Sequence, residues 1–232
     1  MKRAPLTIKT LAVNNLKRKP FRTTCLIIVV FILAFTIFGG SVLTASLKNG
    51  MNSVEQRLGA DIMVVPDGNE ADAEGILLQG KQSYFYFDRS VAEQVAKIEG
   101  VAQVTTQFYL TSVGSDHCSF PVQMIGIDPA TDFVIQPWIA KSYGGELADG
   151  QVIIGSEITP FVDNTVKFFN QTYPVAAKLE KTATGLDTSV FMNMNTIKSI
   201  LASASDLGYN FLSDQEPDSA ISSVLVKVDK GY

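Results

Sequence analysis

Three consecutive residues, Asp116-His117-Cys118, are the strongest candidates for metal chemistry in this sequence. Carboxylate, imidazole and thiolate groups are ligands for zinc and other borderline metal ions. They fall in a predicted turn between two strands, where adjacent side chains point in alternate directions, so at most two of them could reach one ion. His117 is the only histidine and Cys118 is one of two cysteines. We therefore expect a polar turn here, with a metal site as the alternative.

Other motifs that could carry chemistry are incomplete. Gly75-x4-Gly80-Lys81 is similar to a phosphate-binding loop, but Gln82 occupies the position of the Ser or Thr that coordinates magnesium. A Ser-His triad would have to use the single histidine, and no serine lies in a Gly-x-Ser-x-Gly motif. We therefore predict no catalytic residue, no cofactor and no enzymatic activity.

A membrane span is the clearest structural feature of the sequence. Residues 23–47 form a run of 25 residues without Asp, Glu, Lys, Arg or His. A helix of this length extends about 37 Å, more than the roughly 30 Å of the hydrocarbon core of a bilayer. We predict that residues 23–47 cross the cell membrane once. A cleavable signal peptide, with small residues at 44–46, is the alternative.

The distribution of charge predicts the orientation of this span. Seven basic residues and no acidic residue precede it, which favours a cytoplasmic N-terminus. Eight of the 19 basic residues precede Glu55, which leaves 11 against all 23 acidic residues and gives residues 55–232 a net charge of −12. The main domain is therefore expected on the extracytoplasmic side. Nucleic acid is not an expected partner, because the only basic cluster adjoins the span.

Helical patterns flank the span on both sides. Residues 1–22 have apolar residues at helical spacing, which predicts a cytoplasmic amphipathic segment on the membrane surface. Beyond the span the apolar spacing continues over residues 48–59, which predicts a stalk helix that packs against another helix. Packing of this helix on its own domain is the alternative. The predicted contact residues are Leu43, Leu47, Met51, Val54 and Leu58.

The remaining residues predict an α+β fold. Two strand–helix–strand patterns indicate a split βαβ, ferredoxin-like subdomain formed by residues 60–113 and 186–232. Asp88, or a capping box of Ser90 and Glu93, is expected to begin the first helix. The predicted elements are strands at 61–65, 84–87, 101–113, 190–192 and 221–228, helices at 90–99 and 195–204, and an acidic loop at 67–75.

Residues 114–185 predict an inserted β-rich subdomain, because apolar runs alternate there with turn residues. A hairpin turn is expected at Asn170-Gln171. The predicted strands are 122–127, 152–154, 166–169 and 173–179.

In this order, the features resemble the N-terminal half of a permease subunit of a MacB/FtsX-type ABC transporter. The resemblance implies one membrane helix followed by an extracytoplasmic core domain, with no catalytic residue in this chain. Such permeases continue with three further membrane helices, so the resemblance also implies that the chain is a fragment. The segments that carry it are Leu11–Thr23, Leu58–Asp61, Gly100-Val101, Gly126–Pro129 and Gly150–Gly155.

The resemblance implies a function in ABC transport. A separate cytoplasmic ATPase would drive export, substrate release or mechanotransmission through the outer domain. The implied partners are that ATPase subunit, a second permease subunit in a homodimer or heterodimer, and the lipid bilayer. The alternative is a membrane-anchored extracytoplasmic protein that senses or binds a ligand or metal, including a metal-uptake permease.

Overall fold

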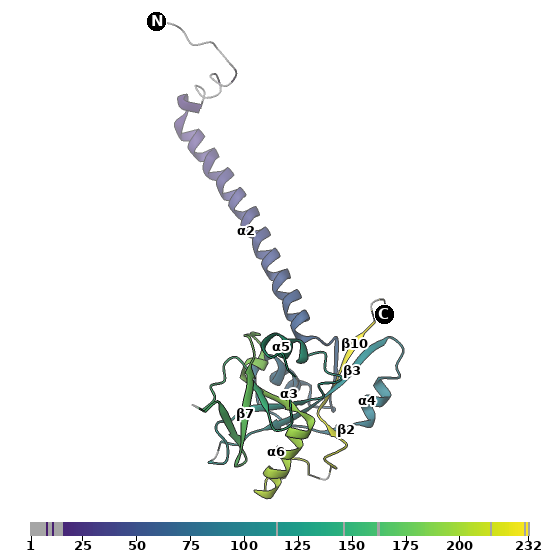
Figure 1. Ribbon diagram of the computed structural model, residues 1–232. Coiled ribbons are helices and arrows are strands. Elements are labelled where there is room, and N and C mark those ends of the chain that lie inside the picture. The colour runs from purple at the N-terminus through teal and green to yellow at the C-terminus, as the bar shows by residue number, and fades with distance from the viewer. Residues whose placement is uncertain are drawn as a thin grey trace. The chain divides into compact units, whose positions relative to one another are not determined.

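The computed structural model describes residues 8, 11, 16–114, 116–145, 147–161, 163–213, 215–229 and 231, without the side chains of residues 49–58. The chain divides into two compact units, Met1–Val54 and Glu55–Tyr232. Helix α2 (Pro20–Leu58) forms most of the first unit and its last residues belong to the second (Figure 1). The two units are described separately below.

Helix α2 is 39 residues long and begins at Pro20, a residue suited to the first turn because no backbone N–H is needed there. The segment Pro20–Lys48 has a mean hydropathy of 2.8, and within the described residues it is the one helix long and apolar enough to cross a membrane. Its apolar side chains are exposed on all sides, with Phe31 and Phe38 both 69% exposed. These properties agree with the predicted span.

Hydroxyl groups in this helix find partners within the helix itself. The Oγ1 atoms of Thr24, Thr36 and Thr44 each donate to the carbonyl oxygen four residues earlier, at 2.8–3.0 Å. Such bonds satisfy polar side chains where no water is available. The threonines are therefore compatible with a lipid environment.

The second unit contains an eight-stranded mixed sheet in the order β1-β10-β3-β4-β8-β5-β7-β6. Pairs β4–β8 and β5–β7 are parallel, and the other neighbours are antiparallel. A separate two-stranded sheet pairs β2 (Phe87–Asp88) with β9 (Ala220–Ile221). The strands of the large sheet are β1 (Ile62–Val64), β3 (Val101–Thr111), β4 (Gln123–Ile127), β5 (Val152–Ile154), β6 (Thr165–Phe168), β7 (Gln171–Lys178), β8 (Ser189–Asn193) and β10 (Ser223–Val228).

Helices cover both faces of the large sheet, so its strands β4, β5 and β8 are buried on both sides. One face packs against α3 (Glu70–Glu74), the π-helix η1 (Gly75–Gln79) and α5 (Gln136–Ser142) through a core that includes Tyr109, Ile125 and Phe191. The opposite face packs against α6 (Met194–Asp206) and α4 (Ser90–Val95) (Figure 1). We call these the α5 face and the α6 face.

The second predicted strand–helix–strand unit is present as β8-α6-β10. Asn193 begins α6 by accepting hydrogen bonds from the Thr196 N–H (2.9 Å) and hydroxyl (2.7 Å). Gly126 on β4 allows close packing of this helix, because a Cβ there would lie 2.5 Å from Cγ2 of Ile197. The α+β fold class is confirmed.

Two local predictions in the first strand–helix–strand pattern are wrong. The residues predicted as an acidic loop contain α3, because Glu70 and Asp72 occupy its first turn, where acidic groups are favourable, and Ala73 packs into the core. The expected strand at 84–87 pairs only at Phe87–Asp88. Of the two expected ways to begin α4, the capping box does not form, because Ser90 lies inside the helix, whereas Asp88 Oδ1 does accept the Ser90 N–H at 2.8 Å.

In residues 114–185 the predicted strands are present within two residues, and they extend the same large sheet. The hairpin turn lies one residue earlier than expected, at Phe169-Asn170, whose φ values are 46° and 66°. Phe169 accepts this unusual conformation because its side chain is buried. Helix α5 was not predicted. The subdomain boundaries at 60–113, 114–185 and 186–232 stay predictions.

Candidate functional site

The predicted stalk residues all lie on α2, which runs without interruption to Leu58. The side chains of Leu43 and Leu47 are 74% and 65% exposed. The side chains of Met51, Val54 and Leu58 fall outside the described residues. The continuous helix agrees with the predicted stalk, and its packing against a partner helix stays a prediction.

Gly59 ends this helix and begins the folded domain. Its φ of +70° favours glycine, and a Cβ there would lie 3.1 Å from Val134 Cα and 3.2 Å from the Phe133 carbonyl oxygen. Two residues later, Asp61 Oδ2 accepts the Val228 N–H at 2.8 Å. The chain therefore enters the domain on the α5 face, held between the segment before α5 and the end of β10.

The structure does not bring Asp116, His117 and Cys118 together on one ion. Cys118 is buried, with its Sγ 3.5 Å from the Phe169 N–H that donates to it. The His117 ring instead lies against Asn170, with 3.2 Å between Nδ1 and Oδ1. In the described part of the chain no group of three or more His, Cys, Asp and Glu side chains could hold a metal ion. The turn packs onto the β6–β7 hairpin.

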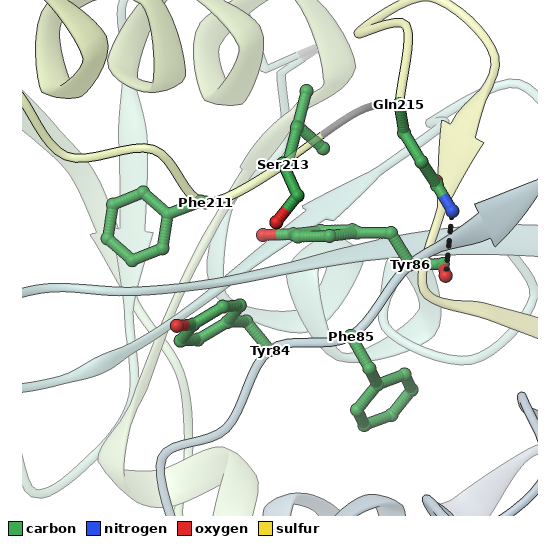
Figure 2. Close-up of a pocket in the computed structure, with 7 residues that line it drawn as sticks. Tyr84, Phe85, Tyr86, Phe211, Ser213 and Gln215 are labelled. Carbon is green, nitrogen blue, oxygen red and sulfur yellow. Dashed lines mark hydrogen bonds between the residues drawn. The ribbon is translucent and has the colours of Figure 1, made fainter.

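An aromatic cleft of about 380 Å³ lies on the α6 face (Figure 2). Tyr84 meets Phe211 edge to face, with 5.1 Å between the ring centroids. Behind them Tyr86 stacks on Phe108 at 4.8 Å. The described residues that line the cleft are Tyr84, Phe85, Tyr86, Phe211, Leu212, Ser213 and Gln215.

Hydrogen bonds hold the two walls of this cleft together. The Gln215 amide donates to the Tyr86 carbonyl oxygen at 3.1 Å, as Figure 2 shows. The Tyr86 hydroxyl donates to the Tyr109 carbonyl oxygen at 2.8 Å, and burial raises the pKa of Tyr86 well above its usual range. Tyr86 is therefore neutral and fixed, whereas Tyr84 is 47% exposed and available for contact.

The chemistry of the cleft suits the binding of an apolar or aromatic group. Its described lining residues are aromatic, aliphatic or uncharged polar residues. Aromatic faces with a few hydrogen-bonding groups bind apolar or aromatic ligands. The cleft was not predicted, because Tyr84-Phe85-Tyr86 was interpreted as a strand and Phe211 was not identified as a candidate binding residue. The clustering of aromatic residues in both segments was the available signal.

No protein-family model and no curated protein matches this chain. Among solved structures, the chain is similar to the extracellular domain of the noncanonic ABC-type transporter YknZ from Gram-positive bacteria, with 14% identity, a TM-score of 0.36, and coverage of 73% of this chain and 83% of that one. It is also similar to the periplasmic region of MacB from Actinobacillus actinomycetemcomitans, with 12% identity, a TM-score of 0.41, and coverage of 78% and 81%.

Proposed function

We propose that this chain is the N-terminal part of an ABC transporter permease, in which α2 couples a separate cytoplasmic ATPase to an extracytoplasmic domain. The observation that carries the proposal is the continuity of α2 from Pro20 to Leu58. About ten residues of helix follow the candidate span, and at 1.5 Å per residue they continue the helix for roughly 15 Å beyond it. A hydrogen-bonded helix of this kind transmits displacement better than a flexible linker does.

The charge distribution supports the same orientation. Four basic residues at positions 17–22 adjoin the start of the span, whereas residues 55–232 carry a net charge of −12. Lys and Arg beside a span are retained on the cytoplasmic side. The segments Leu58–Asp61 and Gly150–Gly155, which carry the sequence resemblance, lie at the start of the domain and around β5.

A second candidate function is ligand sensing by a membrane-anchored domain. The aromatic cleft favours it, because half-exposed Tyr84 and the Gln215 amide could hold a ligand without any second subunit. In that case the domain would act without an ATPase. The presence or absence of an ATPase partner therefore distinguishes the two functions.

Topology is tested by labelling single cysteines with a membrane-impermeant reagent in intact cells or spheroplasts. Cys118 is buried and unsuitable, so we would introduce Lys97→Cys into the domain and Lys17→Cys before the span, both at exposed positions, after replacing Cys25 and Cys118 with Ala. Only Lys97→Cys should be labelled before lysis, because the domain is expected outside. Labelling of Lys17→Cys alone would place the domain inside and refute the proposal.

A further inference from the structure

A buried polar cluster lies on the α5 face. Gln107 and Tyr109 from β3 and Ser223 from β10 are completely buried. The Tyr109 hydroxyl donates to Gln107 Oε1 at 2.8 Å and accepts from the Ser223 hydroxyl at 3.1 Å. Asp132 is near enough to Tyr109 to interact with it electrostatically. Buried polar atoms are normally hydrogen-bonded, so any that lack a partner call for an explanation.

Asp132 carries such an atom. Its side chain is 7% exposed, and its Oδ2 accepts the N–H groups of Ile135 (2.7 Å) and Gln136 (2.6 Å). Its Oδ1 is buried without a hydrogen-bond partner among the described residues, and so is Oε1 of Gln136, four residues further on. Both atoms are acceptors when the carboxyl group is ionised. A single proton on Asp132 would supply a donor, and so would Nε2 of Gln107, which is also buried without a partner among the described residues.

The surroundings of Asp132 favour the neutral carboxyl group. Burial raises its pKa, and the repulsion from Asp128 adds to the increase. The backbone N–H groups at the start of α5 oppose this effect, but the pKa stays above its ordinary value of 3.8. Tyr109 on β3 is the other titratable group that faces it, and burial raises the pKa of Tyr109 also, so Tyr109 is neutral. Ser223 of β10 and Gln136 of α5 are uncharged.

We propose that Asp132 is a proton-binding site, in which Oδ1 holds a proton and donates it to Oε1 of Gln136. The next two residues, Phe133 and Val134, are those that Gly59 packs against where α2 enters the domain. The proton therefore stabilises the segment that receives the helix. This stabilisation is complete below the unfolded pKa and is lost as pH rises through the folded pKa. The contact at Gly59 thus depends on the pH outside the membrane.

The test compares Asp132→Asn with the wild type, using the full chain in detergent and thermal unfolding from below the ordinary carboxyl pKa of 3.8 up to about pH 8. Asn can still accept the two N–H bonds and offers a permanent donor in place of the proton. We expect Asp132→Asn to raise Tm by about 2–4 °C at the high end of the range. The difference should close at the low end, where the wild type is protonated.

Asp187→Asn is the matched control at a second buried carboxylate. Burial raises the pKa of Asp187, but hydrogen bonds from Thr182 and Ala183 lower it more, so Asp187 is ionised. Asp187→Asn should lower Tm at high pH, whereas Asp132→Asn should raise it. Infrared spectra should also show a protonated-carboxyl band that Asp132→Asn removes. Absence of that band, or a lower Tm for Asp132→Asn at every pH, would refute the site and would indicate that Gln107 Nε2 turns to serve an ionised Asp132.

Discussion

Gly185→Ala is expected to destabilise the domain more than any other single-methyl change described here. A Cβ at Gly185 would overlap the Ile76 carbonyl oxygen and lie 2.6 Å from the Gly80 nitrogen. Both are backbone atoms, of η1 and of its C-terminal cap, so no side-chain rotation can relieve the clash with η2 (Gly185–Thr188). We expect the free energy of unfolding to fall by at least about 3 kcal/mol, because overpacking against backbone atoms forces η1 and η2 apart.

Thermal unfolding of the full chain in detergent measures this effect, with an expected fall in Tm of about 6–12 °C. Gly144→Ala is the matched control, since a Cβ there would meet nothing within 4 Å and its φ is not in the left-handed region. Its Tm should match the wild type. A Gly185→Ala protein that unfolds within about 2 °C of the wild type would show that η1 and η2 do not pack as described.

Leu47→Asp is expected to uncouple the ATPase from the outer domain in the assembled transporter. Leu47 is 65% exposed on α2, at the end of the apolar run, and is predicted to face a partner helix. Burying an unpaired carboxylate in that contact would cost several kcal/mol. We expect at least a tenfold loss of stimulated ATP hydrolysis or of transport, because several kcal/mol exceeds the roughly 1.4 kcal/mol of one decade.

Ser46→Asp is the control for charge at the same depth, since adjacent residues of a helix lie about 100° apart around its axis. It should retain most of the activity. The Tm of the domain should be unchanged in both variants. A Leu47→Asp protein whose domain loses stability in parallel with activity would instead favour packing of the helix on its own domain.

The local sequence pattern predicted the secondary structure where a single hydrophobic periodicity dominated a segment. The span, β3, β5 and α6 were predicted because apolar runs or helical spacing at these positions had no competing interpretation. The local sequence pattern failed where tertiary contacts determine the secondary structure. The acidic loop became α3 and η1 because Ala73 and Ile76 dock on the sheet, and Tyr84–Tyr86 divides its side chains between the two faces rather than pairing as a strand. Neither of these contacts can be inferred from residues that are neighbours in the sequence.

The candidate sites follow the same division. The stalk residues were predicted from spacing, which the continuous α2 preserves. The cleft and the Asp132 cluster each join segments more than 20 residues apart, Tyr84 with Phe211 and Tyr109 with Asp132, so only the fold brings them together. Asp132 in particular resembles an ordinary surface aspartate until its burial is known.

The proposed coupling is tested most directly by purifying the protein from its native membranes and measuring ATP hydrolysis. We expect an ABC ATPase subunit to co-purify, with hydrolysis that is abolished when the phosphate-binding lysine of that subunit is replaced. Leu47→Asp should leave the subunit bound but reduce the stimulation of hydrolysis. Purification of an intact, correctly oriented protein without any ATPase subunit would contradict the proposed function and favour the membrane-anchored sensor.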